Sequence, residues 1–128
     1  MTAYPKPALS GPALDVTAFV ALETLVDHDF ATQVAMQFAA DAASVLVELD
    51  RALKRGDGAA FADHLHALRS GAANVGATSL FKLCLAWRDM DDSELAVAGA
   101  QRLAQLHAEF ARACAAMETV LRTMAAAK

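Results

Sequence analysis

Two residues at helical spacing, His66 and Arg69, carry side chains that together could accept and hold a phosphoryl group. A neutral imidazole nitrogen is a nucleophile near neutral pH. Residues three and four positions apart are neighbours on a helix surface, so Arg69 can hydrogen-bond an anion carried by His66. Phosphoryl transfer depends mainly on positioning and charge neutralisation. The spacing therefore points to a histidine that receives a phosphoryl group and passes it on.

The helix predicted over residues 59–75 places His66 opposite its apolar stripe. At about 100° per residue the stripe spans about 80°, and His66 falls about 150° from its centre, facing solvent. Exposed helix surfaces usually carry long charged side chains. Here the neighbours are small or short, which leaves the imidazole projecting and lets another protein approach closely. The expected docking surface consists of Ala62, Asp63, Ser70 and Ala73.

The rest of the chain predicts the elements that must hold this helix. Of the 128 residues, 56% are hydrophobic but only 6% are aromatic, so alanine and leucine dominate. The prolines all lie within the first twelve residues, and a long proline-free, alanine-rich stretch favours helices. We therefore expect a flexible leader or linker over residues 1–13 and one helical domain over 14–128.

Apolar periodicity and turn residues divide this domain into five helices. The expected ranges are 16–25, 30–55, 59–75, 79–88 and 94–124, with Asp15, Asp29 and Thr78 as caps and Gly56 and Gly76 as stops. Each long helix is apolar on one side and must bury that side against another. The predicted fold is all-α, an antiparallel up-and-down four-helix bundle with a short additional N-terminal helix.

Composition and missing motifs exclude several classes of function. The net charge is −4 with no run of Lys or Arg, which argues against nucleic-acid binding. No apolar run approaches the roughly 18–20 residues of a membrane span, and no signal peptide is evident, so we expect a cytoplasmic domain that makes no membrane contact itself, either on its own or as the cytoplasmic part of a membrane-anchored kinase. Cys84 and Cys114 lie in helical apolar patterns and are expected to be buried free thiols.

No nucleotide-binding or hydrolase motif occurs in the chain. The domain is therefore expected to be a carrier without its own ATP site, not an enzyme. A catalytic or metal-binding bundle would need several inward-facing Glu and His residues, and the sequence has no Glu-x-x-His. We expect no cofactor and no metal in this chain.

The histidine motif occupies residues 66–77 and reads HALRSGAANVGA, with Leu80 and Cys84 following. It resembles the signature of histidine-containing phosphotransfer (HPt) domains, which typically read His-x-Leu-Lys-Gly-Ser-Ala, then Gly-Ala, then Leu and often Cys. The resemblance implies that His66 is phosphorylated and that Arg69 replaces a phosphate-stabilising lysine. Ser70 stands where the family usually has glycine. Both substitutions depart from the family pattern: arginine preserves the charge of lysine but adds bulk and a planar fork, and serine adds a hydroxyl beside the imidazole.

Other polar residues near the motif leave alternatives open. Arg88 lies one turn beyond Cys84, so it either reaches the phosphate as a second cation or is a solvated arginine at a helix end. His64 lies near the apolar stripe and is expected to be a partly buried packing residue. His28 and His107 have no motif around them and are expected to have no role.

The same segment also resembles the C-terminal phosphotransfer module of RpfC-type hybrid sensor kinases, which are linked to quorum sensing in bacteria. The resemblance implies a phosphorelay intermediate that carries a phosphoryl group on His66 between aspartates of response-regulator receiver domains, which could lie in the same polypeptide. Mg²⁺ is expected on the partner receiver. The alternative is a docking module in which the small-residue face binds a partner and His66 is only part of the contact.

Overall fold

The computed structural model describes residues 11–25 and 27–126, which form five helices and no strand. These are α1 (Val16–Leu25), α2 (His28–Arg55), α3 (Gly58–Val75), α4 (Thr78–Ala86) and α5 (Asp92–Ala126). The predicted all-α fold is confirmed. The predicted leader falls mostly on residues 1–10, which lie outside the described residues.

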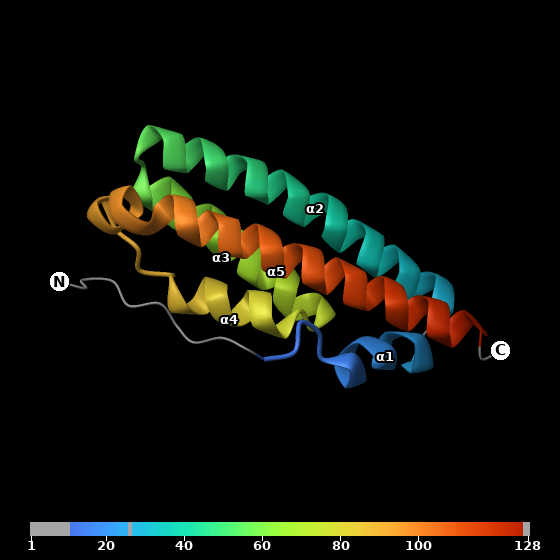
Figure 1. Cartoon of the computed structure of the whole chain (residues 1–128). Helices are drawn as coiled ribbons and strands as arrows, with labels where there is room; N and C mark the ends of the chain where they lie inside the picture. The colour runs from blue at the N-terminus through green and yellow to red at the C-terminus, as the bar shows by residue number, and fades with distance from the viewer. Residues whose placement is uncertain (1–10, 26, 127–128) are drawn as a thin grey trace.

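Four of the helices run alternately up and down and form the bundle (Figure 1). α2 packs against both α3 and α5, and α3 also packs against the short α4. α1 lies at the end of the bundle where α2 begins and α5 ends (Figure 1). A single apolar core joins all five helices, and its largest fully buried apolar side chains include Phe19, Leu46, Leu49, Phe61, Leu65, Leu80 and Leu106.

Local signals in the sequence set both ends of α3. Gly56 ends α2 with φ +66°, a left-handed conformation that glycine adopts without strain. The Asp57 side chain then accepts a hydrogen bond from the backbone N–H of Ala60 at 3.0 Å, which caps the first turn of α3. Gly76 ends α3 with φ +76°. The expected turn and stop are therefore confirmed, and they fix which residues of α3 face outward.

The predicted boundaries of three helices were wrong. α5 spans Asp92–Ala126 and so extends two residues beyond its expected range at each end. α2 begins at His28, because Asp27 and not Asp29 accepts the capping bond from Phe30, at 2.7 Å. α4 begins with Thr78 as its first residue, and the Thr78 hydroxyl donates to the carbonyl of Gly76 instead of capping the helix. α4 also ends at Ala86, two residues earlier than expected, so Arg88 lies beyond the helix.

The junction between α4 and α5 is tightly packed. Arg102 of α5 is only 1% exposed, forms an ion pair with Glu94 and stacks over the ring of Trp87, with 5.2 Å from the guanidinium carbon to the ring centroid. At the same junction Gly58 donates its backbone N–H to the Asp92 carboxylate at 2.6 Å. These contacts tie the end of α4 and the start of α3 to the first turns of α5.

One helix in the described part of the chain, α2, is long and apolar enough to cross a membrane by length and composition, with a mean hydropathy of 1.3 over its best stretch. This differs from the expectation that no such stretch exists. α2 is interrupted by polar residues, yet its valines, phenylalanines and alanines together keep the average high. α2 buries Phe38, Leu46 and Leu49 in the core, but only 22% of this stretch is buried, and a single helix of this length and composition is weak evidence for a membrane span.

Candidate functional site

His66 lies on the outer face of α3, and its side chain is exposed to solvent. All five residues of the predicted stripe on the opposite face are buried, namely Phe61, Leu65, Leu68, Ala72 and Val75. These side chains fix the rotation of α3 in the bundle. The imidazole is therefore held facing outward by a rigid core and not by a loop.

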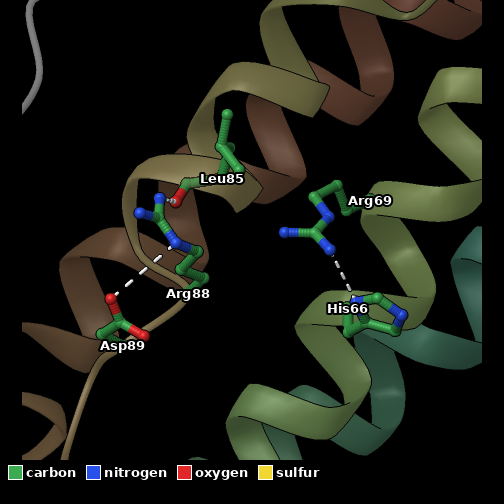
Figure 2. Close-up of polar contacts among 5 residues, drawn as sticks. All are labelled: His66, Arg69, Leu85, Arg88 and Asp89. Atoms are coloured by element: carbon green, nitrogen blue, oxygen red, sulfur yellow. Dashed lines mark hydrogen bonds and ion pairs between the residues drawn. The ribbon is translucent and has the colours of Figure 1, made fainter.

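Arg69 contacts His66 directly. Its Nη2 atom lies 2.8 Å from Nδ1 of the imidazole (Figure 2). A guanidinium has only donors, so Nδ1 is the acceptor in this hydrogen bond. The other ring nitrogen, Nε2, has no partner among the residues that the structure describes, and Figure 2 shows it turned away from Arg69. One nitrogen of the imidazole is thus bound to a cation and the other is open to solvent.

The charge of Arg69 has no carboxylate partner within residues 11–25 and 27–126. Ion pairs with Asp or Glu are formed instead by Arg51, Arg88, Arg102, Arg112 and Arg122. The field of Arg69 also reaches α4: burial raises the pKa of the Cys84 thiol to about 12, and the positive charge of Arg69 opposes this shift. Within the described ranges, Arg69 is therefore a cation without a counter-ion, next to an exposed histidine.

The rest of the predicted docking surface surrounds the imidazole with small side chains. Asp63, Ser70 and Ala73 are exposed, and Ala62 is half-buried. Ser70, at the position where the family usually has glycine, donates its hydroxyl to the backbone carbonyl of His66 at 3.2 Å. This bond satisfies the hydroxyl within α3. The added polar group thus has an acceptor on its own helix.

Arg88 is not brought onto His66. Its Nη1 atom donates to the carbonyl of Leu85 at 2.7 Å, and its Nε atom lies 3.8 Å from the Asp89 carboxylate (Figure 2). Both partners belong to the end of α4 and the segment after it. In this arrangement Arg88 donates to a backbone carbonyl in the last turn of α4, while Arg69 contacts the imidazole.

The remaining histidines and cysteines differ in exposure. His64 is half-buried, as expected, and His107 is exposed on α5. Cys84 is buried as predicted, but Cys114 is only half-buried, because it lines a groove between α2 and α5. No cluster of three His, Cys, Asp or Glu side chains that could hold a metal ion occurs within the described ranges.

Sequence reasoning missed a groove of about 190 Å³ beside the histidine, between α2 and α3. Its walls are mainly apolar and include Val34, Phe38, Val45, Ala67 and Gly71. Gly71 leaves this space because it has no side chain: a methyl group there would lie 3.6 Å from the Phe38 ring. The sequence did contain a signal for this groove. Ala67 and Gly71 are small residues close to His66 in the sequence, but they lie on the side of α3 that faces the groove and not on the side of His66.

Comparisons with known proteins agree with this arrangement. The family model described as the Hpt domain matches residues 33–116, which include all of α3 and α4. The fold is similar to the crystal structure of histidine-containing phosphotransfer protein B (HptB) from Pseudomonas aeruginosa PAO1, with a TM-score of 0.77 and 23% identity over 89% of this chain and 98% of that one. No curated protein sequence matches the chain.

The family match covers the elements that build the site. It spans the exposed histidine of α3, Arg69 and the helices that pack behind them. HPt domains are carriers in phosphorelays and not kinases, and their partners are receiver domains. The chain belongs to the family of Hpt domains and has a histidine phosphotransfer role in phosphorelay signalling.

Proposed function

We propose that His66 is the residue that carries the phosphoryl group, receiving it from an aspartyl phosphate of one receiver domain and delivering it to the aspartate of another. The observation that carries this assignment is the contact between the exposed imidazole and the guanidinium of Arg69, which has no carboxylate partner among the described residues. The family match also includes His64, which is half-buried, and His107, which is exposed on α5 but lies outside the histidine motif of residues 66–77.

The chemistry of the carrier follows from its side chains. An imidazole nitrogen attacks phosphorus, the N–P bond forms, the P–O bond to the receiver aspartate breaks, and the carboxylate leaves. Arg69 neutralises charge on the phosphoryl oxygens through charge-assisted hydrogen bonds. The partner supplies the carboxylate and Mg²⁺, and this chain contributes no cofactor and no ATP site of its own.

The proposed docking surface is the small-residue face formed by Ala62, Asp63, Ser70 and Ala73. Its exposed members lie on the same side of α3 as His66, and none is a long charged side chain that would keep a partner away. Arg88 is proposed as a second cation that joins the phosphate only after leaving the carbonyl of Leu85.

A transfer assay tests the assignment. Receiver domains from the source organism are loaded with ³²P from acetyl phosphate and Mg²⁺, and each is mixed with the chain. We expect label on the wild-type protein that is labile in acid and stable in alkali. His66→Gln should abolish labelling, whereas His107→Gln should be labelled like wild type. Helicity by circular dichroism should be the same for all three proteins.

Two outcomes would contradict the proposal. If His66→Gln accepts label as well as wild type, another residue carries the phosphoryl group. If His66→Gln keeps both receiver binding and signalling in cells, phosphoryl transfer through His66 is not required and the docking alternative is correct. A position within a larger kinase, as in the RpfC-type proteins, and a cytoplasmic location remain proposals that the sequence flanking this domain in its full-length gene product would test.

A further inference from the structure

The hydrogen bond between Arg69 and His66 determines the protonation pattern of the imidazole. Because the guanidinium can only donate, Nδ1 uses its lone pair to accept this bond. A neutral imidazole carries one ring proton, so that proton must lie on Nε2. In this arrangement neither nitrogen presents a free lone pair: Nδ1 is occupied by Arg69, and Nε2 carries hydrogen.

We propose that Arg69 is a positioning residue that holds His66 in a non-nucleophilic form at rest and releases it when an incoming phosphoryl group draws the guanidinium away. This inference rests on the proposed role of His66 as the phosphoryl acceptor. It gives Arg69 two successive tasks: it first suppresses the reactivity of the imidazole, and it then stabilises the transferred group.

The charges around Arg69 favour such a release. No carboxylate holds the guanidinium in place within residues 11–25 and 27–126, so its only bond to a side chain there is to a neutral ring nitrogen. The bond to Nδ1 is a single bond to a neutral acceptor, whereas phosphate oxygens carry negative charge and a guanidinium can bind them in bidentate pairs. An aspartyl phosphate that docks beside His66 is therefore a better partner for Arg69 than Nδ1 is.

The step balances without any further reactant. After Arg69 leaves, Nδ1 takes a proton from water while Nε2 gives one to water, so the imidazole stays neutral. The free lone pair of Nε2, on the side of the ring turned away from Arg69 (Figure 2), attacks phosphorus. The N–P bond forms, the P–O bond to the receiver aspartate breaks, and the electron pair leaves with the carboxylate.

Arg69→Met tests the proposal, because methionine keeps an unbranched side chain but removes every donor. Two reactions of His66 are compared at pH 8, where ordinary imidazoles are neutral. Diethylpyrocarbonate is an uncharged electrophile, and its adduct on His66 is measured by peptide mass spectrometry. Transfer from a ³²P-loaded receiver domain uses an anionic electrophile. We expect the variant to react several-fold faster with diethylpyrocarbonate and about tenfold slower with the receiver.

The opposite directions of the two changes separate this proposal from a purely electrostatic role, which would slow transfer and leave the uncharged reagent unaffected. Arg51→Met is the matched control, since Arg51 lies on α2 and pairs with Glu48. It should change neither rate. Ring ¹⁵N chemical shifts give a second measurement: wild-type His66 should be mainly the Nε2–H tautomer, and Arg69→Met should populate the Nδ1–H tautomer.

An unchanged diethylpyrocarbonate rate at His66 together with an unchanged tautomer in Arg69→Met would overturn the proposal. That result would leave the role of His66 intact, provided that wild-type protein is still labelled by the receiver and His66→Gln is not. Labelling of His66→Gln would instead contradict the proposed function, because another residue would then carry the phosphoryl group. Failure of the Arg69 proposal and failure of the His66 assignment are therefore distinguishable.

Discussion

Arg69 and Arg102 show two opposite uses of the same side chain in one small bundle. Arg102 is buried at the junction of α4 and α5, where it pairs with Glu94 and stacks on Trp87. Burial also lowers the pKa of its guanidinium. Arg69 lies at the surface of α3, bonded to a neutral imidazole nitrogen and to no carboxylate of the described residues.

The difference separates structure from function. A buried arginine must have its charge compensated inside the protein, so Arg102 is committed to holding α4 against α5. An arginine without a carboxylate partner keeps its charge available for an anion from outside. The region around Arg102 is closed and tightly packed, whereas the region around Arg69 is open and lined with small side chains. Substitutions in the closed region and in the open one should therefore have different consequences.

The largest expected effect is at the closed region. Arg102→Met should destabilise the fold by about 3 kcal/mol, the lower end of the range for breaking a buried ion pair, because Glu94 is left without its partner but remains 20% exposed. Arg69→Met should change stability by less than about 0.5 kcal/mol. Urea denaturation of both variants measures the difference, and equal midpoints would show that the junction is not a stabilising cluster.

A pair of glycines gives the next largest contrast. A methyl group at Gly58 would lie 2.9 Å from backbone atoms of Asp91 and Asp92, which cannot yield easily, so Gly58→Ala should destabilise by about 1–3 kcal/mol. At Gly71, in the open groove, the same methyl meets only the Phe38 ring at ordinary distance. Gly71→Ala should therefore stabilise α3 by up to about 1 kcal/mol. The Tm should fall in Gly58→Ala and rise in Gly71→Ala. A change of the same sign in both variants would refute the contrast between the packed junction and the open groove.

Cys84 should make stability depend on alkaline pH. Burial raises the pKa of its thiol from the ordinary value of 9.0 to about 12 in the fold. The unfolded chain therefore loses this proton first, and the stabilisation present below pH 9 is lost as the pH rises toward 12. At pH 10 the loss from this group is about 1.4 kcal/mol. The free energy of unfolding, measured with urea from pH 8 to 10, should fall less steeply with pH for Cys84→Ala than for wild type. An equal pH dependence in the two proteins would argue against a raised pKa of the Cys84 thiol.

The smallest effect is expected at Ser70. Its hydroxyl bonds only the carbonyl of His66 on its own helix, so Ser70→Gly should reduce stability by about 0.5 kcal/mol through the greater backbone freedom of glycine. The variant restores the residue usual in the family and should transfer phosphate at least as fast as wild type. Slower transfer by Ser70→Gly in the receiver assay would mean that the hydroxyl takes part in docking.

Much of the fold was predictable because the informative signals are local. The stripe on α3 and the glycines at 56 and 76 depend on helical periodicity and on positive φ angles, which sequence reveals directly. The start of α2 was missed because two aspartates, Asp27 and Asp29, are equally good caps by type.

The site was predictable to a similar depth. The exposure of His66 followed from the helix wheel, and its spacing from Arg69 gave the contact now seen between their nitrogens. The position of Arg88 did not follow, because it depends on where α4 ends and on the carbonyl of Leu85. Nor did the burial of Arg102, since its partners Glu94 and Trp87 lie eight and fifteen residues away and meet it only in the folded bundle.

The small side chains around His66 also bear on how long a partner stays bound. Alanine has no rotamers to lose when a surface is covered, so docking on Ala62 and Ala73 imposes little entropic penalty. The same methyl groups bury little apolar area and provide little affinity. Partners that dock on this face should therefore arrive and depart quickly, and short residence times suit a carrier that must exchange one partner for the next.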